Sequence, residues 1–114
     1  MKEVKAYVRI RMVDQVVRAL EEAGFDRMTI IDVSALGKLA DEKEAKYSIE
    51  FVEKHSKMAK IELACKDRDV DQVVETIQKN ACTHQPGDGI IFVAPVERAV
   101  KIRTCEEGEQ ILQA

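Results

Sequence analysis

The amino-acid sequence predicts an α+β fold in which two strand–helix–strand units share one sheet. Apolar residues first alternate with polar ones, as in a half-buried strand, and then recur at helical spacing. The same order of patterns occurs twice along the chain. The 114 residues, of which 46% are hydrophobic, suit one domain with a core of its own. Valine, isoleucine, leucine and alanine must fill that core, because the chain has two Tyr, three Phe and no Trp.

The first unit is predicted within residues 4–34. Alternation marks a strand at four positions, which are Val4, Ala6, Val8 and Ile10. Helical spacing follows at Val13, Val16, Val17 and Leu20. Gly24 stands where this helix should stop, because glycine readily adopts the left-handed conformation that ends helices. Residues 28–34 are rich in β-branched side chains and make the second strand.

The second unit follows the same plan within residues 57–95. The third strand covers residues 57–65, and its inward face is made by Ala59, Ile61, Leu63 and Cys65. Helical spacing over residues 70–81 predicts the second helix, with Asp69 as its N-cap. Residues 90–94 form the fourth strand, which Pro95 ends. The predicted fold is a ferredoxin-like βαββαβ sandwich with both helices on one face of the sheet.

The second face of this sheet has no helix to cover it. Apolar side chains on such a face favour burial against other copies of the chain, so we expect a homo-oligomer. The alternative is a monomer with a polar outer face, and Arg9, Arg11, Lys60 and Glu62 favour it.

Residues 36–56 are too long for a routine connection between strands, which points to a functional loop or a further element. The first half, residues 41–46, has helical propensity, whereas residues 47–52 alternate like a strand. One interpretation is an extended hairpin with a charged turn. The other is a probe that changes shape with ligand and contacts another protein through Tyr47, Ile49 or Phe51.

Composition and motifs argue against several classes of protein. The net charge is −3, so the chain lacks the excess of positive charge that binds the phosphate backbone of nucleic acid. No apolar run approaches membrane-spanning length, and the N-terminal residues lack a signal peptide's apolar segment, so we expect a cytoplasmic protein that is not embedded in a membrane. Neither histidine has a serine or carboxylate at a catalytic spacing, so we do not expect an enzyme.

A Gly-Asp-Gly motif at residues 87–89 opens the fourth strand, and basic residues follow it. Glycine lets the backbone approach a ligand closely, and Lys101 and Arg103 supply cations for phosphate oxygens. The motif alone is also typical of a simple turn that enters a strand.

Several stretches of this sequence resemble the P-II nitrogen-regulatory signal-transduction proteins. The resemblance is strongest in residues 87–93 and 101–106, is supported by residues 28–30 and 60–63, and spans essentially the whole chain. It implies one P-II-like domain over residues 1–114, with residues 36–56 as the family's T-loop. P-II proteins are trimers that bind ATP or ADP between neighbouring subunits, often with Mg²⁺ and 2-oxoglutarate. They act through the T-loop on a target protein, either a membrane transporter or a metabolic enzyme.

The resemblance assigns roles by position. The nucleotide-binding residues would be Thr29, Gly37, Lys38, Gly87, Asp88, Gly89, Lys101 and Arg103. Lys101 and Arg103 would meet the Gly-Asp-Gly loop across a subunit boundary. Contact with the target protein would use Tyr47, Ser48, Ile49 and Phe51.

Five positions depart from the family pattern; one is Cys105, which stands in place of a glycine, and the other four concern ligands or modification. Ile90 replaces a phosphate-binding lysine, which should weaken the binding of ATP. Leu39 replaces a glutamine that helps to hold Mg²⁺ and the oxo-acid, and offers no ligand oxygen. Met58 replaces the lysine that pairs with the oxo-acid, so we predict weak or absent 2-oxoglutarate sensing. Phe51 replaces the tyrosine that many enterobacterial relatives modify, which argues against control by uridylylation.

Three cysteines do not suggest a structural disulfide in a cytoplasmic chain. Cys65, on the inward face of its strand, is interpreted as a small buried hydrophobe. Cys82 and His84 lie two residues apart and have the chemistry to share a soft metal with a neighbour's Cys105, and with His55. An alternative function is therefore a metal or redox sensor serving a metal-efflux system. The competing interpretation is that these are unrelated surface and packing residues.

Overall fold

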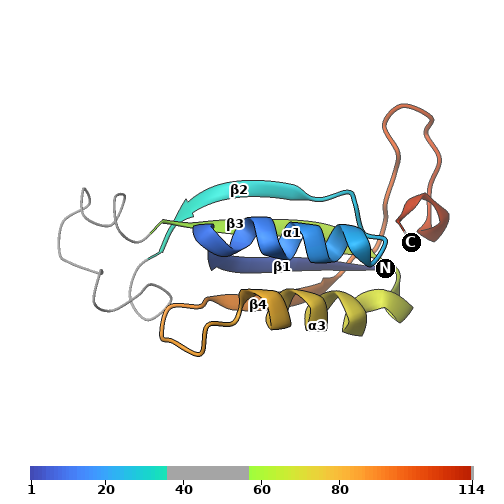
Figure 1. Cartoon of the computed structure of the whole chain (residues 1–114). Helices are drawn as coiled ribbons and strands as arrows, with labels where there is room; N and C mark the ends of the chain where they lie inside the picture. The colour runs from blue at the N-terminus through green and yellow to red at the C-terminus, as the bar shows by residue number, and fades with distance from the viewer. Residues whose placement is uncertain (36–56, 114) are drawn as a thin grey trace.

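A four-stranded antiparallel sheet carries two helices on one face (Figure 1). The computed structural model describes residues 1–35 and 57–113. Its strands are β1 (Lys2–Arg9), β2 (Thr29–Ser34), β3 (Lys57–Cys65) and β4 (Ile90–Pro95), and its helices are α1 (Val13–Glu22) and α3 (Val70–Ala81). The strand order is β2-β3-β1-β4. The predicted ferredoxin-like arrangement is confirmed.

The register of the sheet separates an inner face from an outer face. The central strand β1 pairs with β3 and with β4, and Val4 lies opposite both Leu63 and Val93. Residues at every second position of β1 and β3 are buried beneath the helices, while Lys60 and Glu62 alternate with them on the outer face. The period of two read from the sequence therefore selects which face receives the helices.

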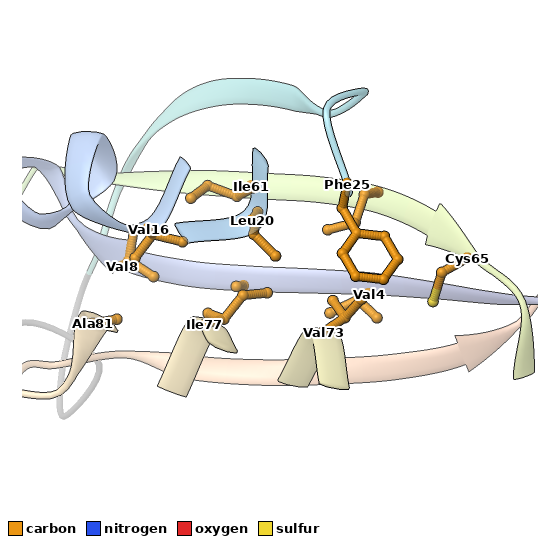
Figure 2. Close-up of a cluster of buried hydrophobic side chains, with 12 residues drawn as sticks. Val4, Val8, Val16, Leu20, Phe25, Ile61, Cys65, Val73, Ile77 and Ala81 are labelled. Atoms are coloured by element: carbon orange, nitrogen blue, oxygen red, sulfur yellow. The ribbon is translucent and has the colours of Figure 1, made fainter. Parts of the chain in front are cut away.

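The core lies between the inner face and the two helices (Figure 2). Val16 and Leu20 of α1 and Val73 and Ile77 of α3 are fully buried against β1 and β3. Phe25, just beyond α1, is the largest fully buried side chain. Cys65 is buried in the same cluster, which confirms its role as a small core residue, and burial raises the pKa of its thiol.

Two element ends differ in detail from the prediction. Ile10 does not continue the buried face of the first strand, because it begins a 3₁₀ turn over Ile10–Met12 and stays exposed. Asp69 is the N-cap residue of α3, as predicted, but its side chain makes no capping hydrogen bond: it closes a 3₁₀ turn over Asp67–Asp69, so its backbone is already helical. A side-chain N-cap requires an extended backbone at that residue. Gly24, in contrast, has a φ of +97° after α1, as predicted.

The segment after β4 folds back as a hairpin whose closing bridge joins Val100 to Glu107. The backbone N–H of Cys105 donates to the Lys101 carbonyl at 2.8 Å, and Ile102 at the tip is 96% exposed. The chain then returns to the sheet, where the buried Gln113 amide donates to the Arg27 carbonyl at 2.6 Å and accepts from the Arg27 N–H at 2.8 Å. This clamp holds the C-terminal segment beside the start of β2.

The outer face of the sheet is mixed in character. Tyr7 and Phe92 make an edge-to-face contact with ring centroids 6.2 Å apart, and Lys60 lies 6.0 Å from the centre of the Tyr7 ring. Phe92 is 52% exposed, and Ile31 and Ile90 are also exposed on this face. No described element of the chain covers these side chains.

Candidate nucleotide site

The loop before β4 is organised by the side chain of Asp88. Its carboxylate accepts a hydrogen bond from the Thr83 N–H at 2.7 Å and another from the Thr83 hydroxyl. Arg9, at the end of β1, donates to the same carboxylate at 3.0 Å and to the Pro86 carbonyl at 2.6 Å. Because the carboxylate is used within its own chain, a phosphate contact from the Gly87–Gly89 segment would come from backbone N–H groups.

These contacts decide the charge state of Asp88. Partial burial by itself raises the pKa of the carboxyl, but the hydrogen bonds from Thr83 and Arg9 and the charge of Arg9 outweigh it. The net effect lowers the pKa of Asp88 to about 2. Asp88 is therefore ionised at neutral pH, and Arg9 offsets its negative charge beside the candidate phosphate loop.

Gly89 has a structural reason to be glycine. Its φ is +99°, and a Cβ there would lie 1.7 Å from the Tyr7 carbonyl oxygen. Only a residue without a Cβ lets the loop pass this close to the backbone of β1. The close approach that the sequence suggested at this glycine is thus made to the protein's own backbone, before any ligand is considered.

The cations predicted to join this loop lie elsewhere in the chain. Lys101 and Arg103 are exposed residues of the hairpin that follows β4, whereas residues 87–89 precede β4. A strand of six residues separates the two groups, which is about 20 Å at 3.3 Å per residue. One copy of the chain does not bring the loop and these cations together.

Thr29 is also distant from the loop within one chain. It is the first residue of β2, lies opposite Glu62 and is exposed. Because β2 and β4 are the two edge strands, three strand spacings, about 14 Å, separate them. The other predicted site residues lie outside the described residues; these are Gly37, Lys38, Tyr47, Ser48, Ile49 and Phe51, together with Leu39 and His55.

Two departures from the family pattern in the described part of the chain put an apolar residue in place of a lysine. Met58 is 3% exposed and packs with Ala35, Val33 and Tyr7. Ile90 directly follows Gly89, lies opposite Tyr7 and is exposed. Arg9 lies opposite Met58 in the sheet, but its guanidinium donates to Asp88 and to the Pro86 carbonyl.

Cys82 and His84, at the end of α3, lie close together. The distance from Cys82 Sγ to His84 Nδ1 is 3.6 Å. Cys105 is exposed in the hairpin after β4, on the far side of that strand from the Cys82 loop. Within residues 1–35 and 57–113, no group of three or more His, Cys, Asp or Glu side chains has the geometry to hold a metal ion.

Comparison with known proteins places the chain. A family described as Nitrogen regulatory protein P-II matches residues 1–106. The Nitrogen regulatory protein P-II 2 of Methanothermobacter thermautotrophicus is 40% identical over 114 residues, with 96% of each chain covered. The chain belongs to the P-II family. Nitrogen regulatory protein P-II of Rhodobacter capsulatus is 38% identical, with 96% of this chain and 97% of the relative covered. The resemblance inferred from the sequence motifs is therefore confirmed.

The family description names P-II proteins as regulators. The P-II protein of Pasteurella multocida, 35% identical over 116 residues, carries the same name. In the part of the chain that the structure describes, no helix has the length and apolar composition needed to cross a membrane.

The structure adds residues that the sequence did not indicate. Arg9 and Thr83 fix the side chain of Asp88, and the Tyr7 carbonyl fixes Gly89. Arg9 and Asp88 are 79 residues apart in sequence, so no local pattern joins them. Thr83 lies five residues before Asp88 in a loop rich in turn formers, and that spacing was the one available signal.

Proposed function

We propose that this P-II chain is a signal-transduction regulator that binds ATP or ADP between subunits. The observation that carries the proposal is the separation along β4: the Gly87–Gly89 loop precedes this strand, and Lys101 and Arg103 follow it. Backbone donors and cations from these two places converge on one polyphosphate only when different copies contribute them. The reported match to P-II proteins supports the same arrangement.

The proposed assembly is a homotrimer formed through the outer face of the sheet. This face exposes Ile31, Ile90 and Phe92, while the helices cover the opposite face. Burial of this apolar area supplies the free energy for association. Copies that meet at this face bring edge strand β4 of one subunit near edge strand β2 of another, which is also where Thr29 lies.

We propose that the bound nucleotide changes the conformations of the T-loop, residues 36–56, and so the affinity for a target protein. Ligand binding and target binding must then be coupled by the same free energy in both directions. The family name supports a place in the control of nitrogen metabolism. The proposed regulator acts in the cytoplasm, and its proposed target is a membrane transporter or a metabolic enzyme. This role is regulatory, with no catalytic step.

Isothermal titration calorimetry tests the nucleotide proposal. ATP, ADP, AMP, cyclic nucleotides and bicarbonate are titrated into the intact protein, and sedimentation gives the number of subunits. We expect an adenine nucleotide to bind, and Arg103→Ala to weaken it at least tenfold, because a bidentate phosphate contact is lost. Arg18→Ala is the matched control, since Arg18 is an exposed arginine paired with Asp14 on α1. Absence of adenine-nucleotide binding below millimolar concentration would contradict the proposal.

Ile90→Lys is expected to raise the affinity for ATP about five- to thirtyfold. The exposed position directly follows Gly89, so the new ammonium would stand beside the phosphate loop and contribute about 1 to 2 kcal/mol. The gain should shrink as salt is added. Ile90→Gln is the neutral control. An equal gain with glutamine, or no gain with lysine, would show that charge at this position does not limit ATP binding.

A further inference from the structure

The turn after α3 brings a thiol and an imidazole together. Cys82 ends the helix: its N–H donates to the Gln78 carbonyl at 3.1 Å, and its backbone is already extended. Two residues later His84 has a φ of +62°, in the left-handed region. The chain reverses there, which places Nδ1 of His84 3.6 Å from Sγ of Cys82.

This separation has the size that one tetrahedral zinc ion requires. Zinc binds cysteine sulfur at about 2.3 Å and histidine nitrogen at about 2.0 to 2.1 Å, and the tetrahedral angle then places the two atoms about 3.6 Å apart. Linear coordination, which suits a two-ligand Cu⁺ site, would need the sum of two such bonds, more than about 4 Å. The observed distance is the shorter one.

We propose that Cys82 and His84 form a Zn²⁺-binding site at the end of α3, with side chains that the nucleotide proposal does not use. Cys82 is partly accessible and His84 is exposed, so a hydrated cation can reach both ligand atoms. The described residues supply no third His, Cys, Asp or Glu in reach, and the Asp88 carboxylate is held by Thr83 and Arg9. Water or a second copy of the chain can complete the coordination.

The backbone conformation of His84 restricts where its side chain can lie. In the part of the chain that the structure describes, His84 and Cys105 are the two non-glycine residues with positive φ. Such a conformation costs about 1 to 2 kcal/mol for a residue with a Cβ, and sites that use it hold a side chain in a fixed place. At His84 the fixed place is beside Cys82.

The decisive experiment is a Zn²⁺ titration of the intact, reduced protein against a chromophoric chelator. We expect one Zn²⁺ per chain, and a loss of affinity of tenfold or more in both Cys82→Ser and His84→Asn, because each removes one ligand. Asparagine is chosen because it tolerates positive φ. Co²⁺ in place of Zn²⁺ should give a thiolate-to-metal charge-transfer band that Cys82→Ser abolishes, a signal that a merely structural effect would not remove.

Cys105→Ser is the matched control, because it also replaces an exposed thiol at a residue with positive φ. The proposal requires that this variant keep the cobalt band. Zn²⁺ affinity unchanged in Cys82→Ser, or a cobalt band lost only in Cys105→Ser, would overturn it. Circular dichroism of each variant checks that the fold is kept. Zn²⁺ binding is measured without nucleotide, so an absence of Zn²⁺ binding would not contradict the nucleotide proposal.

Discussion

Gly89→Ala is expected to lower the free energy of unfolding by at least about 3 kcal/mol, because a methyl group would enter the space of a backbone carbonyl. The added Cβ would lie 1.7 Å from the Tyr7 oxygen and 3.0 Å from the end of the Met58 side chain. The thioether can move, but the carbonyl belongs to the central strand β1. Relief therefore requires the end of β4 to separate from β1, where Tyr7 and Ile90 are paired.

Urea denaturation at one fixed protein concentration measures this effect. Gly87→Ala is the matched control, since Gly87 has nearly the same φ, +97°, without the contact to Tyr7. It should lose only the conformational advantage of glycine, about 1 to 2 kcal/mol. Equal losses in the two variants would mean that backbone conformation, and not the approach to Tyr7, determines the need for glycine at position 89.

Asp88→Asn is expected to lower stability by about 2 kcal/mol at pH 7, and by much less near pH 2. The carboxyl titrates with a pKa of about 2 in the folded protein and near 3.8 when unperturbed. This difference corresponds to about 2 kcal/mol. The Asp88 side chain is 22% exposed and that of Arg9 is 14% exposed, so solvent screens the pair only in part.

The direction of the pH dependence follows from the lowered pKa. Folding favours the ionised form of Asp88, so its contribution is complete above the unfolded pKa of about 3.8 and is lost as pH falls through about 2. Urea midpoints of the parent and the variant should therefore converge between about pH 4 and pH 2.

Asp14→Asn provides the comparison for an ordinary surface carboxylate. Asp14 pairs with Arg18 at 3.0 Å, but both side chains are about three-quarters exposed, at 75% and 74%. Removing this charge should change stability by about 0.5 kcal/mol or less. If Asp14→Asn and Asp88→Asn have the same effect at pH 7, the network around Asp88 does not stabilise the loop.

Local patterns predicted the framework of the fold because burial on one face imposes a period on the chain. Val4, Ala6 and Val8 are buried, and the predicted apolar positions of both helices pack in the core, except Val17, which is half-buried outside it. The ends of the strands and helices were harder to predict. Short 3₁₀ turns precede both helices: the first removes Ile10 from the strand, and the second leaves Asp69 at the N-cap without a capping hydrogen bond from its side chain.

The sequence predicted which residues belong to the candidate site, but not how they are arranged in space. The motifs identified Gly87, Asp88 and Gly89 through their likeness to the family, but the sequence offered no reason to place Arg9 against Asp88. A long-range ion pair depends on where two strands end, which no window of sequence contains. The gathering of Lys101 and Arg103 with the loop depends on neighbouring copies, so it stays a prediction.

The place of β4 at the sheet edge has a further consequence. One strand joins the Gly87–Gly89 loop to the hairpin that carries Lys101 and Arg103, so each proposed site would draw its halves from different molecules. A subunit impaired in its loop and a subunit impaired in its hairpin would then complement each other when mixed, because their interface pairs an intact loop with an intact hairpin. In a mixed trimer of this kind, the number of working sites would depend on which subunits are neighbours and not only on the amount of normal protein.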